Sequence, residues 1–273
     1  MRKISIVVLA SLWWLVGCAN AQVKREFTVS GDHGKLAAVL QAPEGKKTYP
    51  LVLILHGFNA NKEMYLLTEL ARQLNERGIG AVLFDFNGHG ASEGSFLDMT
   101  IPNEMEDARR VYAHISKWPQ VTSVSLVGHS MGGIETSMLA AELGEDKIKS
   151  IVLMAPAGEL PEDVRSGELF GAKFDPQNVP EYIQIFTGLK IGRAFLETTQ
   201  AVPVYEASAG YTGPVLIVHS QDDQLVPYKY GQRFLQIYPQ AQLETLHGFD
   251  HNFTQDTPKV DKIVVDFFAE QLQ

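Results

Sequence analysis

The sequence feature that most constrains the fold of this chain is the segment SVSLVGHSMGG at residues 123–133. It reads as a short apolar strand, a tight turn and the start of a helix, with Ser130 in the turn between Gly128 and Gly132. Such a sharp turn strains the backbone of the serine. It also needs the two glycines, because a Cβ atom at either position would collide with neighbouring backbone. The turn holds the hydroxyl outward, so we expect Ser130 to act as a nucleophile.

Patterns of buried strands and amphipathic helices alternate on both sides of this turn. Continuous apolar runs predict strands buried on both faces of a sheet, and strands separated by helices predict right-handed crossovers in a mostly parallel sheet. The first two strands are an exception, because the residues between them, 31–34, predict an antiparallel hairpin. The other predicted strands are residues 51–55, 79–84, 151–154, 215–219 and 242–246, and the predicted helices include residues 63–77, 102–118, 228–237 and 258–271.

Four residues follow the ends of predicted strands: His56, Asp85, Ser130 and Ala155. Parallel sheets place their functional sites beyond the carboxyl ends of the strands. We therefore expect these four residues to lie along one edge of the sheet.

The alternation breaks over residues 157–212, where proline, glycine and aromatic residues are scattered without a period. A structureless loop of this length is implausible inside a compact domain, so we expect an inserted cap over the strand ends. Aromatic side chains of this cap could stack on a planar substrate, or could form a small core of the cap itself. The chain has 273 residues, of which 45% are hydrophobic, and this fits one domain over residues 22–273 that carries the cap.

A serine nucleophile needs a base, and the base needs a carboxylate that orients it. In hydrolases with a serine on a strand–turn–helix, the chain order is serine, acid and histidine, so both partners should follow the cap. The acid should come after the strand at residues 215–219, which leaves Asp222 and Asp223. The base should come after the next strand, which leaves His247 and His251.

Seven short pieces of the chain carry a resemblance to known proteins. The pieces are His56-Gly57-Phe58, residues 85–92, Gly128 to Gly132, Met154-Ala155-Pro156-Ala157, Pro203-Val204-Tyr205, residues 223–227 and Asp250-His251. Through them the chain from residue 22 onward resembles the α/β-hydrolase superfamily, and specifically the bacterial cinnamoyl and feruloyl esterases. The resemblance implies the α/β-hydrolase fold, a mostly parallel twisted sheet flanked by helices with an inserted cap.

The resemblance also implies roles for particular residues. It places the acid on Asp223 and the base on His251, and the backbone N–H groups of Met131 and Phe58 are expected to hold the oxyanion of an acyl-transfer intermediate.

Two further residues of the cap are implied to bind substrate. Asp163 stands where the related esterases place an aspartate that meets the phenol hydroxyl of the acyl group. Phe170 stands where relatives carry a polar cap residue.

The expected activity is hydrolysis of hydroxycinnamic esters of small-molecule or oligosaccharide alcohols through an acyl-enzyme. Two alternatives stay open: a general short-chain carboxylesterase or monoacylglycerol-type lipase, and a non-catalytic binding protein on a hydrolase scaffold. No cofactor is expected. No metal is expected either, since no short-spaced ligand motif occurs, although His219, Asp222 and His251 form an alternative ligand set. The oligomeric state is left open.

Residues 1–21 read as a leader, with Arg2 and Lys3 before an apolar run that is too short to span a bilayer. Two readings compete. Residues 15–18 resemble a bacterial lipobox in which Cys18, the only cysteine, becomes lipidated, and the alternative is cleavage before Gln22. We therefore expect a secreted, periplasmic or outer-membrane-anchored protein. The net charge of −9 argues against nucleic acid or anionic lipid as partners, which leaves membrane attachment only through the lipid.

Overall fold

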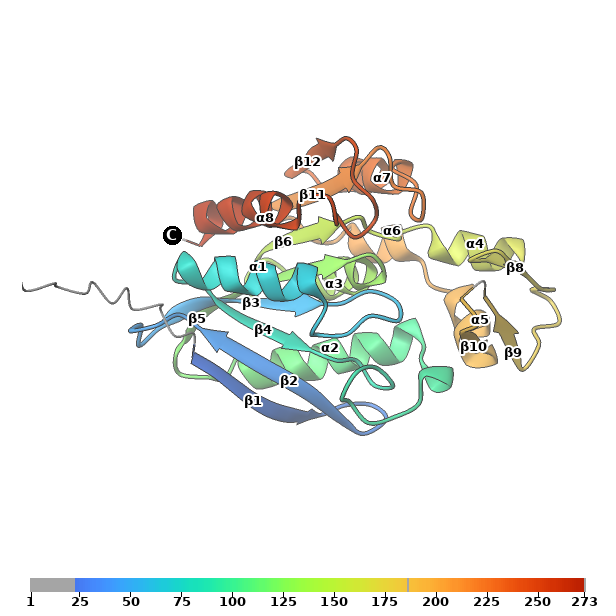
Figure 1. The fold of residues 1–273 in the computed structure, drawn as a ribbon, viewed down its shortest axis with the longest axis horizontal. Coiled ribbons are helices and arrows are strands. Elements are labelled where there is room, and N and C mark those ends of the chain that lie inside the picture. Colours follow the sequence, from blue (N-terminus) through green and yellow to red (C-terminus); the bar gives the residue numbers. More distant parts are fainter. Residues whose placement is uncertain (1–22, 186, 273) are drawn as a thin grey trace, which may run out of the picture.

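The computed structural model describes residues 23–185 and 187–272. Its centre is an eight-stranded sheet in the order β1-β2-β4-β3-β5-β6-β11-β12, drawn in Figure 1. The first two strands pair antiparallel, β2 pairs antiparallel with β4, and every later pair in this sheet is parallel. The strands are β1 (Val23–Ser30), β2 (Lys35–Ala42), β3 (Tyr49–Leu55), β4 (Gly80–Phe84), β5 (Val121–His129), β6 (Ile148–Met154), β11 (Val215–Ser220) and β12 (Ala241–Leu246).

The predicted alternation of strands and helices is confirmed, with helix ends shifted by a few residues. The helix predicted from Pro102 begins one residue earlier, because Thr100 and Asn103 form a reciprocal capping box around its first turn. The large helices are α1 (Tyr65–Glu76), α2 (Ile101–Ile115), α3 (Met131–Leu143), α7 (Lys229–Ile237) and α8 (Thr257–Gln271), and a 3₁₀ turn η1 covers Phe96–Asp98.

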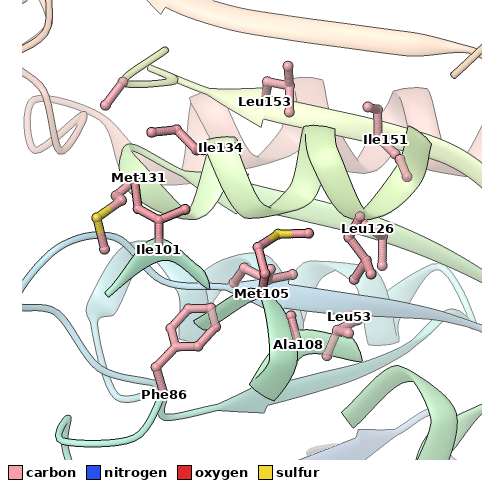
Figure 2. Packing of buried hydrophobic residues seen from close by; sticks show 14 of the residues in the cluster. Leu53, Phe86, Ile101, Met105, Ala108, Leu126, Met131, Ile134, Ile151 and Leu153 are labelled. Carbon is pink, nitrogen blue, oxygen red and sulfur yellow. The ribbon is translucent and has the colours of Figure 1, made fainter. Parts of the chain in front are cut away.

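Side chains of each central strand alternate between two buried layers. On β3, Leu53 lies in the core cluster shared with α2 and α3, whereas Val52 and Ile54 lie in the cluster shared with α1 and α8. Figure 2 shows the first layer, where Met105 of α2 and Ile134 of α3 lie over the sheet. Burial on both faces explains why these strands read as continuous apolar runs.

The segment between β6 and β11 forms the elements beside the strand ends at the right of Figure 1. Its aromatic residues do not only fill a core of their own. The hydroxyl of Tyr211 donates to the carbonyl of Ile148 over 3.1 Å, and the ring of Tyr205 packs on Phe234 of α7. The elements are α4 (Leu160–Ser166), β7 (Glu168–Leu169), β8 (Ala172–Lys173), β9 (Tyr182–Gln184), β10 (Lys190–Gly192), α5 (Arg193–Thr199) and α6 (Val204–Ser208).

The predicted leader and Cys18 lie outside the described residues. Within the described part of the chain, no helix has the length and apolar character needed to cross a bilayer.

Candidate active site

Ser130 occupies the turn between β5 and α3 with φ 58° and ψ −120°, a region that non-glycine residues rarely adopt. Its N–H donates to the carbonyl of Met154 over 2.9 Å, which holds the turn against β6. The predicted need for glycines is confirmed. A Cβ at Gly128 would lie 1.9 Å from the carbonyl oxygen of Gly132, and one at Gly132 would lie 2.4 Å from the carbonyl oxygen of Leu55.

Asp223 and His251 come together across 28 residues of sequence. His251 Nδ1 lies 2.7 Å from Asp223 Oδ2, and both residues are buried. The other carboxylate oxygen of Asp223 accepts the N–H groups of Leu225 and Val226, each over 2.9 Å. The carboxylate of Asp223 is therefore fixed by its own loop. Because it holds Nδ1 of His251, the other ring nitrogen, Nε2, points away from the carboxylate.

The electrostatics of this pair favour an ionised carboxylate. Burial acts to raise the pKa of Asp223, but hydrogen bonds from His219 and His251 outweigh it and bring the pKa below the ordinary value of an aspartate. His219 Nε2 lies 3.4 Å from Asp223 Oδ2 and donates to the carbonyl of Val226 over 3.0 Å. An ionised Asp223 can hold the imidazole in one tautomer and stabilise its cation.

The other two sequence candidates for acid and base lie at the surface. Asp222 is exposed, and its carboxylate accepts the N–H of Gly248 over 2.6 Å. His247 is exposed as well. Among residues 23–185 and 187–272, no group of three or more histidine, cysteine or acidic side chains has the arrangement of a metal site.

Ser130 and His251 line the same cavity, which has a volume of about 550 Å³. His129 lies beside them, and its ring is 4.8 Å from that of His251 between centroids. The rest of the cavity wall combines amide and apolar side chains: Asn59, Asn61, Met64, Phe170, Ile185, Leu225 and Asn252.

Two backbone N–H groups beside Ser130 have no partner among the hydrogen bonds of the described residues, those of Phe58 and Met131. Met131 is the first residue of α3, where helix geometry leaves the N–H without an acceptor. Its side chain is anchored in the core near Ile101 and Ile134, as Figure 2 shows. Phe58, Ser130 and Met131 border one narrow pocket, and two free N–H groups beside a serine suit an oxyanion.

The loop that carries Phe58 is tied to the sheet through Asp85. This buried carboxylate accepts the backbone N–H of Lys62 over 2.6 Å, pairs with the Lys62 ammonium at 2.9 Å, and accepts the N–H of Ala91 over 2.8 Å. His56 also braces the loop, since its Nε2 accepts the N–H of Phe86 over 3.1 Å. The expectation that His56, Asp85, Ser130 and Ala155 share one edge is confirmed.

The narrow pocket contains both cap residues predicted to bind substrate, Asp163 and Phe170. Asp163 is half-buried, and the hydroxyl of Tyr230 lies 3.4 Å from each of its carboxylate oxygens. Burial raises the pKa of Asp163, although the Tyr230 hydroxyl acts against that shift. Phe170 packs on Phe58 at 5.1 Å between ring centroids.

Phe170 adopts φ 47° in a two-residue turn between β7 and β8. A left-handed conformation costs a bulky residue about 1–2 kcal/mol, and such turns normally carry asparagine or glycine. The ring is therefore held in the pocket at a cost in backbone strain.

Sequence reasoning did not identify Leu225 or Tyr230 as parts of this site, and it named His219 only as an alternative metal ligand. His219 had a usable signal, because it ends a strand four residues before Asp223 and so lies at the same sheet edge. Tyr230 gave no local signal, since it meets Asp163 across 67 residues.

Comparisons with known proteins agree with the α/β-hydrolase fold expected from the sequence. The family model described as serine aminopeptidase, S33, matches residues 46–184. Among solved structures, the chain is similar to Est1E from Butyrivibrio proteoclasticus with ferulic acid bound. The two are 33% identical with a TM-score of 0.86, and the match covers 90% of this chain and 98% of that one.

Curated relatives include lipases. The chain is 25% identical over 240 residues to lysophosphatidylserine lipase ABHD12 of Danio rerio, a match that covers 81% of this chain and 59% of the relative. It is 23% identical over 262 residues to monoacylglycerol lipase ABHD6 of Rattus norvegicus, covering 81% of this chain and 75% of the relative. The chain spans only about three fifths of the first curated relatives that it matches.

Proposed function

This chain belongs to the serine aminopeptidase S33 family of α/β-hydrolases and is a serine hydrolase of the esterase and lipase type, and from that premise we propose that it hydrolyses esters of hydroxycinnamic acids. The observation that carries this proposal is the narrow pocket beside Ser130, where the ring of Phe170 and the carboxylate of Asp163 lie together. An aromatic wall and a half-buried hydrogen-bond acceptor suit a phenolic ring. The ferulic acid bound to the similar Est1E supports the same substrate class.

The proposed reaction uses the residues described above. His251 accepts the proton of Ser130 as the serine oxygen bonds to the ester carbonyl carbon, and Asp223 stabilises the resulting imidazolium. The N–H groups of Phe58 and Met131 hold the oxyanion. His251 then gives its proton to the leaving alcohol as the ester C–O bond breaks. Water attacks the acyl-enzyme by the same route, which releases the acid and restores Ser130.

The wider cavity beside Ser130 is the proposed place of the alcohol. Its amide side chains, Asn59, Asn61 and Asn252, can donate to and accept from hydroxyl groups. Among the described residues of its wall there is no lysine, arginine, aspartate or glutamate. This lining favours a neutral polyhydroxylated alcohol such as a sugar over an alcohol that carries a phosphate.

A lipase acting on monoacylglycerol-type esters is the second candidate. It is favoured by the apolar side chains of Met64, Ile185 and Leu225 in the same wall, which could contact an acyl chain. The names of the curated relatives point in the same direction.

One comparison of substrates separates the two candidates. Purified protein should hydrolyse methyl ferulate with a higher kcat/KM than p-nitrophenyl octanoate, and the opposite order would favour the lipase. Ser130→Ala should abolish both activities and prevent labelling by a fluorophosphonate probe. Retained turnover in that variant would exclude Ser130 as the nucleophile. Labelling that is absent from the wild type as well would favour a non-catalytic binding protein.

Secretion and lipid attachment at Cys18 remain part of the proposal. An esterase whose substrates are hydroxycinnamic esters of oligosaccharides would meet them outside the cytoplasm, and a lipid anchor would keep it at the cell surface. Metabolic labelling with a radioactive fatty acid tests this, with Cys18→Ser as the control. A wild-type protein that takes up no label would exclude the lipoprotein.

A further inference from the structure

We infer that the acyl end of this site can open by movement of its wall, so that an acyl group longer than a single aromatic ring can pass between Asp163, Phe170, Leu225 and Tyr230 into a second groove. The inference rests on the proposed function, because it assumes that the acyl group enters the narrow pocket beside Ser130. It extends the substrate class to aromatic acyl groups that carry a further substituent at the far end of the ring.

Three cavities adjoin one another through shared wall residues. They are the cavity with Ser130 and His251, the narrow pocket, and a groove of about 560 Å³. Phe170 and Leu225 border all three spaces, and Asp163 and Tyr230 border the last two. These four residues, which we call the throat, are the only wall shared by the narrow pocket and the groove within the described chain.

The narrow pocket is too small to be the complete acyl site. It encloses about 20 Å³, which is room for about one water molecule, whereas pockets that bind small ligands usually enclose about 300–1,000 Å³. An aromatic ring can enter only if part of the wall moves. The throat residues are the part of that wall which the pocket shares with the groove, so their movement would join the two spaces.

Leu225 is the throat residue with the most freedom to move. It is 46% exposed and lies in the loop between β11 and α7, where its side chain faces solvent on one side. Rotation of an exposed leucine sacrifices little buried contact. Phe170 has less freedom, because its ring packs on Phe58.

The chemistry of the groove defines useful probes. Its wall includes the carboxylates of Asp163 and Glu168, so a neutral substituent avoids charge repulsion. The probe should keep a donor beside the ring, since Asp163 would accept from it. Methyl 4-acetamidocinnamate and methyl 4-(4-phenylbutanamido)cinnamate meet both conditions, because each has an amide N–H on the ring and they differ only in the length beyond it.

We expect the wild type to hydrolyse the long probe with a kcat/KM within about threefold of the short one. Ser166 lines the groove but neither of the other two cavities, so Ser166→Trp should fill the groove alone. That variant should lower kcat/KM for the long probe by about tenfold or more and change methyl ferulate by less than about twofold. Leu235→Trp, at a 37% exposed position on α7, is the matched control and should leave both rates unchanged.

A second variant guards against an uninformative loss of folding. Leu225→Ala widens the throat and should raise the ratio of long-probe to short-probe kcat/KM.

If the wild type cleaves methyl ferulate and the short probe but not the long one, the acyl end is closed and the inference is wrong while the proposed function stands. If neither methyl ferulate nor the short probe is cleaved although p-nitrophenyl octanoate is, the proposed function fails and the inference fails with it. Equal slowing of both probes by Ser166→Trp would also overturn the inference.

Discussion

His129 Nε2 donates a hydrogen bond of 2.9 Å to the main-chain carbonyl of His251, so the residue before Ser130 holds the backbone of the proposed base. His129 is buried, and its pKa is lowered to about 3, chiefly by burial and also by the neighbouring charge of His251. It therefore stays neutral over the working range of an esterase. A neutral ring in this place adds no positive charge that would oppose the imidazolium of His251 during the reaction.

The first prediction concerns this hydrogen bond. His129→Ala should lower kcat by about 10- to 100-fold with little change in KM, because the base loses its fixed position relative to Ser130. Steady-state kinetics on methyl ferulate measure both parameters. The matched control is His114→Ala at an exposed position on α2. A kcat equal to that of the control would show that the His251 loop is held without His129.

The second prediction tests the carboxylate. Asp223→Asn should lower kcat by about 10⁴-fold, because an amide can stabilise neither the required tautomer nor the imidazolium. Asp222→Asn serves as the control, since Asp222 lies at the surface and its carboxylate accepts the backbone N–H of Gly248. Comparable losses in the two variants would contradict the assignment of the acid.

The third prediction concerns recognition of the phenol. Asp163→Ala should reduce kcat/KM for methyl ferulate by about tenfold or more, because the ring hydroxyl loses its acceptor. The kcat/KM for methyl cinnamate should hardly change, because that substrate has no ring hydroxyl. The informative quantity is the ratio of the two substrates measured in each variant. An unchanged ratio would mean that Asp163 does not contact the phenol.

The fourth prediction concerns stability and pH. Asp261 of α8 is fully buried, and neither of its carboxylate oxygens has a hydrogen-bond partner among the described residues. Burial, with a smaller contribution from Glu69, raises the pKa of Asp261 to about 9. The folded protein therefore keeps this proton between about pH 4 and pH 9 while the unfolded chain has lost it.

Stability from this residue should fall as pH rises through that window, by up to about 1.4 kcal/mol per pH unit. Asp261→Asn cannot ionise, so its free energy of unfolding should fall less steeply between pH 5 and pH 8.5. Urea unfolding of both proteins at several pH values provides the measurement. Parallel curves for the two proteins would rule out a buried protonated Asp261.

The helices and strands with a clear pattern of apolar residues were predictable from sequence. Strands such as β3 are apolar on both faces because both faces are buried. The start of a helix such as α2 is indicated by a capping residue, Thr100, and by Pro102 in its first turn. The acid and base could be narrowed to two candidates each by chain order. The choice of Asp223 and His251 needed the resemblance, and the structure brings these two together at 2.7 Å.

The cap was predictable only as a region. Its strands have two or three residues, too few for a period of two to be recognised. The left-handed turn at Phe170 could not be inferred from a bulky residue that normally avoids it, and only the following Gly171 indicated a turn. The contact of Tyr230 with Asp163 depends on how α7 packs beside α4, which no local pattern encodes.

The close approach of Gly132 to the end of β3 limits how this enzyme can evolve. The helix behind the serine rests directly on the main chain of Leu55 and His56, without any side chain between them. The distance between the Ser130 oxygen and the N–H group of Phe58 is therefore fixed by contact between two segments of main chain. Side-chain substitutions can change this distance little. Lineages that acquire new substrates should accumulate their changes in the cap and in the loop of Leu225, and the elbow should stay the same.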